Sequence, residues 1–185
     1  MYWGIGALGY EKESKELMKV LGLEWEPVAV RYQSAPEAEG EVSRKIRVCE
    51  AFDVVRREGV TINLSKENCT CSGGRHYAGL EIMPLDRIAA VWKDAHLAYD
   101  SVEKALDSVR KQPQPVKMGN WVVMAPLSKV RKRPDMVSVF TNPLQADRLL
   151  AIASYKGASR SPSTRSTASA RSSRTLWRRE GRRSI

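Results

Sequence analysis

The most reactive part of the sequence is residues 69–76, which read CTCSGGRH. Two cysteines and a histidine lie within this short polar segment, and a third cysteine precedes it on a helix-like segment. Thiolates and imidazoles are ligands for zinc, iron and iron–sulfur clusters. The residue types therefore predict a site for a metal ion or a cluster, and the candidate ligands are Cys49, Cys69, Cys71 and His76.

The spacing of these residues matches no established metal-binding template. Cys69 and Cys71 form a C-x-C pair rather than a C-x-x-C knuckle, and no second paired half follows. Each candidate ligand also has another interpretation. Cys49 is most simply interpreted as a small buried apolar residue, and His76 as a solvated or hydrogen-bonded side chain. For Cys69 and Cys71, a metal, cluster or redox role is weighed against an inert core role, which is less natural on a polar loop.

A second kind of site is suggested by Gly73, Gly74 and Arg75. Glycines let the backbone turn tightly and expose amide N–H groups, and the arginine adds a positive charge. Such a group predicts a site for the phosphate or carboxylate of a small ligand at the start of a helix. Because the segment lacks the lysine and the spacing of a P-loop, anion binding without a metal is the alternative function.

The rest of the sequence contains no recognisable catalytic set. No Ser-His-Asp triad, carboxylate pair or nucleotide-binding fingerprint can be assembled from it. We interpret His96 as a structural residue. The basic run of residues 129–133 (KVRKR) is interpreted as a solvated turn, with an anion-binding patch as the alternative. The sequence therefore leaves open whether the protein is an enzyme.

The elements that position these residues are predicted from hydrophobic periodicity and from turn and cap residues. Five main helices are expected, at residues 11–21, 47–58, 85–96, 101–111 and 142–155, and a short one begins near Arg75. Strands are expected at residues 27–32, 60–64, 120–127 and 136–140, the last two as a hairpin or as neighbouring strands. This order predicts an α+β (mixed α/β) fold, in which a small mixed sheet of about four strands packs with about five helices.

Composition divides the chain at residue 156. Residues 157–185 contain eight arginines and one glutamate, so they carry +7 of the formal net charge of +10 and leave +3 for residues 1–156. Most of this tail is Ser, Thr, Ala and Arg, which predicts disorder because little apolar surface can be buried. The tail is interpreted either as an arm that binds nucleic-acid phosphates non-specifically or as an out-of-frame translation.

Several protein classes are excluded by the pattern as a whole. The sequence has no run of about 18 apolar residues, so we expect no membrane-spanning segment. The first residues lack the basic and apolar regions of a secretory signal. Three unevenly spaced cysteines are too few for a disulfide scaffold. We therefore expect a cytoplasmic protein whose partner is a metal ion or an unknown small molecule.

The order of features along the chain resembles the DUF169 (ArCR) family of archaeal and bacterial proteins. The shared features are the segments LGL (21–23), PVAV (27–30), CSGG (71–74), WVVMAPL (121–127), PDMV (134–137) and NP (142–143), together with Cys49. The resemblance covers residues 15–156. It implies a cytoplasmic protein and carries any metal ligation by the family's cysteines to Cys49 and Cys71.

The resemblance also bears on the C-terminal part of the chain. Family members continue beyond the last expected helix into a further glycine- and cysteine-containing half, which the Arg/Ser tail replaces here. This difference predicts a truncated or frameshifted domain that spans residues 1–156. It also predicts exposed apolar surface, and with it association into a homo-oligomer.

Overall fold

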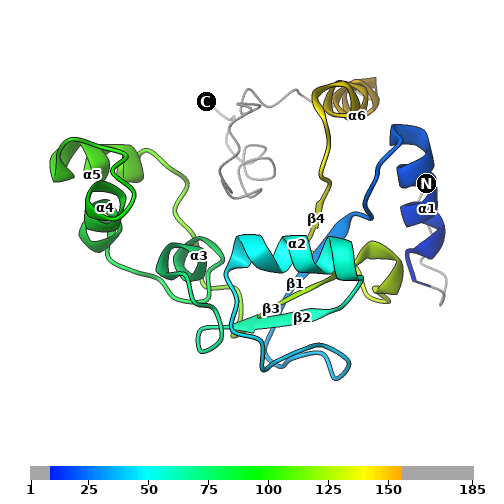
Figure 1. The fold of residues 1–185 in the computed structure, drawn as a ribbon, viewed down its shortest axis with the longest axis horizontal. Coiled ribbons are helices and arrows are strands. Elements are labelled where there is room, and N and C mark those ends of the chain that lie inside the picture. The colour runs from blue at the N-terminus through cyan, green and yellow to red at the C-terminus, as the bar shows by residue number, and fades with distance from the viewer. Residues whose placement is uncertain (1–8, 156–185) are drawn as a thin grey trace, which may run out of the picture.

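The computed structural model describes residues 9–155 and contains a four-stranded sheet in the order β2-β3-β1-β4. Figure 1 shows the helices arranged around this sheet. The strands are β1 (Val28–Gln33), β2 (Ile62–Ser65), β3 (Trp121–Pro126) and β4 (Met136–Ser138). The expected tail of residues 157–185 lies outside the described residues. The α+β class predicted from the sequence is confirmed.

All three ladders of the sheet are antiparallel, whereas we expected a mixed sheet. Parallel pairing is limited to two isolated bridges, Glu41 with Ile62 and Ile46 with Cys69. The longest ladder joins β1 and β3, with Val28 opposite Pro126 and Gln33 opposite Trp121. The central strands read as nearly continuous apolar runs because both of their faces are covered.

The expected pairing of β3 with β4 is wrong, because β1 lies between them. After β3, the 3-10 helix η1 (Leu127–Lys129) and a basic turn carry the chain to the far side of β1. There the backbone amide of Asp135 donates to the Val30 carbonyl, and the Asp135 carboxylate accepts from the Tyr32 amide. These long-range hydrogen bonds place β4 beside β1.

Helix α2 (Val48–Glu58) covers one face of the sheet (Figure 1). Its buried residues Ala51 and Val55 join the main apolar cluster, which includes Val28 and Val30 of β1. Ala29 points to the opposite face, where a smaller cluster contains Ala125, Leu127 and Val130. Alternate residues of β1 therefore serve two separate apolar layers, as expected for strand periodicity.

Helix α1 (Glu11–Leu21) packs beside η1 and ends at Gly22, which has the left-handed φ of +64°. Helix α3 (Ser72–Tyr77) follows β2, and it begins earlier than the short helix we expected near Arg75. Helices α4 (Leu85–Asp94) and α5 (Val102–Arg110) form a pair at one end of the molecule (Figure 1). The pair has its own apolar cluster, built on Met83, Ile88 and Val109.

Helix α6 (Pro143–Tyr155) begins at the cap predicted from Asn142 and Pro143. Gln145 donates its amide to the Asn142 side chain, and the Gln145 side chain accepts from the Asn142 amide. No side chain of α6 is buried among the described residues, and Leu144 and Ile152 are exposed. The homo-oligomer expected from exposed apolar surface stays a prediction.

Within residues 9–155, no helix has both the length and the apolar character that crossing a bilayer requires.

Candidate functional site

The loop between β2 and α3, which carries Cys69 and Cys71, is fixed by Asn68. The buried side chain of Asn68 accepts a hydrogen bond from the Ser65 amide at 2.7 Å. Its Nδ2 donates to the carbonyls of Asn63 at 2.7 Å and Val42 at 2.8 Å. Asn68 therefore ties the cysteine loop to β2 and to the segment that precedes α2.

Sequence reasoning did not identify Asn68 as a site-positioning residue. The available signal was an asparagine directly after a predicted strand, where its side chain commonly bonds to nearby backbone. The bond to Val42 joins residues 26 positions apart, and it has no signature in the local sequence.

The segment before α2 runs beside the cysteine loop. The Ile46 amide donates to the Asn68 carbonyl at 3.0 Å, and the Thr70 amide donates to the Ile46 carbonyl at 3.1 Å. The Cys69 thiol donates a hydrogen bond to the Cys71 carbonyl at 3.7 Å, and the backbone of Val48, the first residue of α2, lies close enough to lower the pKa of this thiol. The structure thus brings the start of the helix that carries Cys49 next to the loop that carries Cys69.

Cys69 is 2% exposed, and burial raises the pKa of its thiol above the ordinary value. The negative charge that Cys71 carries when ionised also raises this pKa, so the two thiols are electrostatically coupled. Backbone hydrogen bonds at Cys71 and Val48 and the charge of Arg75 lower the pKa, but burial is the largest effect. Cys69 is therefore a protonated thiol at neutral pH, with groups around it that partly stabilise a thiolate.

Cys71 is half-buried and caps the N-terminus of α3. Its Sγ accepts a hydrogen bond from the Gly74 amide at 3.2 Å. A Cβ on Gly74 would approach the Val48 side chain to 3.0 Å and the Cys71 sulfur to 3.5 Å. A side chain at position 74 would therefore press on Val48, so glycine favours the close packing of α3 against α2. Gly73 has open space around it and no such contact.

Two of the three groups predicted to bind an anion, the Gly74 amide and Arg75, are already engaged within the protein. The Gly74 amide donates to Cys71, as described above. The Arg75 Nε forms an ion pair with Glu81 at 3.2 Å, and Lys66 pairs with the same carboxylate at 3.0 Å. The positive charge of Lys66 and Arg75 holds the pKa of Glu81 below its usual range, with the Lys66 hydrogen bond as the largest cause.

Among residues 9–155, the two remaining metal-ligand candidates form no metal-binding group with Cys69 and Cys71. Cys49 is exposed on the first turn of α2, so its interpretation as a buried apolar residue is wrong. His76 is 1% exposed, and its Nδ1 accepts from the Met83 amide at 3.1 Å. This bond fixes the chain between α3 and α4.

The four candidates do not assemble into one metal centre. Among residues 9–155, no group of three or more His, Cys, Asp or Glu side chains is placed to hold a metal ion. What the fold does bring together is the pair Cys69 and Cys71.

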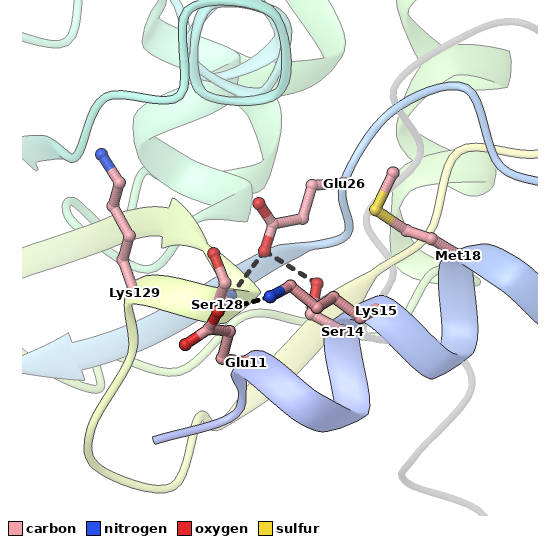
Figure 2. A pocket seen from close by; sticks show the side chains of 7 residues that line it. All are labelled: Glu11, Ser14, Lys15, Met18, Glu26, Ser128 and Lys129. Carbon is pink, nitrogen blue, oxygen red and sulfur yellow. Dashed lines mark hydrogen bonds and ion pairs between the residues drawn. The ribbon is translucent and has the colours of Figure 1, made fainter. Parts of the chain in front are cut away.

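A separate cleft of about 390 Å³ is lined by residues of α1 and η1 and by Glu26, and Figure 2 shows the side chains that line it. At its base, Glu26 Oε1 accepts hydrogen bonds from the Ser14 hydroxyl at 2.7 Å and from the Ser128 amide. Lys15 is paired with Glu11 across one turn of α1. Because these polar groups satisfy one another, we interpret the cleft as the junction that holds α1 against η1.

The sequence matches the DUF169 family of uncharacterised ArCR proteins over residues 16–171. The chain belongs to the DUF169 family. No curated protein and no solved structure matches it.

The DUF169 match confirms the resemblance seen in the order of sequence features. It includes the cysteine loop and all four strands, and it extends beyond residue 156, where we expected the domain to end. The family description assigns no chemistry to DUF169 proteins. The function must therefore be argued from the side chains that this fold brings together.

Proposed function

We propose that this DUF169 protein binds one Cu⁺ ion through Cys69 and Cys71. The observation that supports the proposal is a pair of electrostatically coupled thiols two residues apart, one of which, Cys71, accepts a hydrogen bond from the Gly74 amide. N–H groups directed at sulfur stabilise the thiolate form, which is the form that binds metal. A buried sulfur and a half-buried one also give the ion an environment with restricted access to water.

The number of available ligands favours Cu⁺ over the zinc ion or iron–sulfur cluster suggested by the sequence. Structural zinc sites use four protein ligands, and common iron–sulfur clusters use four cysteines. The described residues offer no group of three or more candidate ligands. Cu⁺ prefers soft thiolates and is satisfied by two of them in a linear arrangement.

Proton release accompanies binding in this proposal. Both thiols lose a proton to solvent as two Cu–S bonds form, so the product carries one net negative charge. The nearby charge of Arg75 offsets this negative charge. Because burial raises the pKa of Cys69, removing its proton opposes binding at neutral pH. Cu⁺ affinity should therefore increase with pH until Cys69 is ionised in the free protein.

The proposal is tested by anaerobic competition between the protein and a coloured Cu⁺ chelator. The wild-type chain should retain one Cu⁺ per molecule, and Cys69→Ser and Cys71→Ser should each weaken binding by at least tenfold. Cys49→Ser is the matched control because Cys49 is the exposed third cysteine, and it should bind like wild type. Loss of binding in Cys49→Ser alone, or no binding by wild type, would contradict the proposal.

A further inference from the structure

We propose that the basic turn, residues 129–133, which runs from the last residue of η1 toward β4, is a docking surface for the phosphate backbone of nucleic acid. Three consecutive side chains of this turn, Arg131, Lys132 and Arg133, are exposed. Within residues 9–155, none of the three forms an ion pair with a carboxylate. The proposal is independent of the metal site, because the turn contains no residue of the cysteine loop.

The turn is anchored at both ends, so its cations are presented on a rigid support. Val130 is buried against Leu127 and Ala29, and its amide donates to the Leu127 carbonyl. On the other side, Asp135 bonds to the backbone of Val30 and Tyr32 through its amide and its carboxylate. A preorganised turn loses less conformational entropy on binding than a mobile one.

Within residues 9–155, the carboxylate of Asp135 forms no ion pair with the cations of the turn. Asp135 directs its carboxylate to the Tyr32 amide at 2.8 Å. Lys129 differs from the other cations, because its Nζ donates to the Gly59 carbonyl at the end of α2. Arg131, Lys132 and Arg133 therefore remain as the cations available to a polyanion.

The composition of the surface favours nucleic acid over a lipid membrane. Two of the three cations are arginines, whose planar guanidinium groups match the geometry of phosphate. Membrane-surface segments combine basic residues with apolar residues that insert into the bilayer. In the described chain, no exposed large apolar side chain lies between residues 119 and 136.

The experiment measures binding of the full chain to a fluorescent 20-base-pair DNA duplex at several salt concentrations. The test variant carries Arg131→Gln, Lys132→Gln and Arg133→Gln. The control carries Arg87→Gln, Lys104→Gln and Arg110→Gln on α4 and α5, at the other end of the molecule (Figure 1). Both variants remove two arginines and one lysine from exposed positions, so their net charges are identical.

The test variant should lose affinity, and its log-log salt dependence should become less steep by about 2–3, as expected for three lost phosphate contacts. The control should keep the wild-type slope. Equal slopes in the two variants, or no duplex binding by wild type at low salt, would overturn the proposal. Vesicles of mixed phosphatidylcholine and phosphatidylserine provide a second arm. If the test variant lost as much affinity for these vesicles as for the DNA duplex, or more, the assignment to nucleic acid would be overturned.

Discussion

At the scale of single residues, two opposing effects act on the Cys69 thiol. It is buried, which favours the neutral thiol, whereas the backbone of Cys71 and Val48 and the charge of Arg75 favour the thiolate. The first effect is larger, so the pKa of Cys69 is raised. A metal ion that replaces the proton would remove this conflict, because its positive charge stabilises the buried thiolate.

The raised pKa of Cys69 predicts a loss of stability at alkaline pH. The folded protein holds the thiol proton more tightly than the unfolded chain, so this contribution to stability is fully present below the unfolded pKa of about 8.5. It is lost as the pH rises through the folded pKa, with a slope of at most about 1.4 kcal/mol per pH unit for one group. Urea unfolding between pH 7 and pH 10 measures this slope.

Cys69→Ala is the control for this pH experiment, because it removes the titrating group. The free energy of unfolding of Cys69→Ala should depend less on pH above about 8.5 than that of wild type. Cys49→Ala changes an exposed thiol and should leave the wild-type dependence intact. If the free energy of unfolding depended on pH in the same way in wild type and in Cys69→Ala above about pH 8.5, Cys69 would have the same pKa in the folded and the unfolded chain. That result would contradict the prediction.

Asn68 supports a second prediction at this scale. Asn68→Ala removes three hydrogen bonds of the Asn68 side chain, one that it accepts and two that it donates. The Ser65 amide and the Asn63 carbonyl lose the hydrogen bonds that they form with this side chain. Leaving buried polar groups unsatisfied costs about 1–3 kcal/mol. We expect a destabilisation of about 2–3 kcal/mol in urea unfolding. Lys66→Ala, at an exposed position of the same loop, should cost less than about 0.5 kcal/mol.

At the scale of the elements, the connection from α4 to α5 contains local strain. Leu97 has φ of +48°, the only positive φ of a non-glycine residue among residues 9–155, and its side chain is 83% exposed. The left-handed region costs an L-residue about 1–2 kcal/mol. The side chain contributes little packing in return, because most of it is in solvent.

We therefore expect Leu97→Gly to stabilise the protein by about 0.5–1 kcal/mol, after the entropy cost of glycine in the unfolded chain is subtracted. Leu97→Ala is the matched control, because it removes the same exposed side chain but keeps the Cβ. Gly59→Ala provides the reverse case, since Gly59 ends α2 with φ of +67° and its Cβ would meet no atom within 4 Å. It should destabilise by about 1 kcal/mol. A higher Tm for Leu97→Ala than for Leu97→Gly in thermal unfolding would refute the strain argument.

Local sequence signals predicted the elements better than their arrangement. Helix α1 was predicted at its observed bounds, and α6 from the asparagine and proline that begin it, because periodicity and caps are local properties. The place of β4 beside β1 was not predicted, because Asp135 fixes it through bonds to Val30 and Tyr32 far away in the sequence.

The same reasoning explains which site residues were missed. The residue types identified Cys69 and Cys71 as a candidate pair. The exposure of Cys49 depends on which side of α2 faces the sheet, and Ala51 and Val55 decide this through tertiary packing. The role of His76 depends on the return of the chain at Met83, which no local pattern specifies.

At the scale of the whole molecule, the apolar interior is divided. The main cluster lies between the sheet and α2, whereas α4 and α5 pack chiefly on each other around Met83, Ile88 and Val109. Figure 1 shows this helix pair at the far end of the molecule from α1. Separate clusters that share few contacts tend to unfold as separate units.

This division predicts that α4 and α5 open without unfolding of the sheet. Native-state hydrogen exchange should give opening free energies for the amides of α4 and α5 that are lower than those for β1 and β3. Val109→Ala should lower the values in α4 and α5 by about 1–2 kcal/mol and leave those in β3 unchanged. Val122→Ala, in the main cluster, should instead lower the values for β1 and β3. If Val109→Ala reduced protection in β3 as much as in α5, the chain would unfold as one cooperative unit, and the two clusters would be energetically coupled.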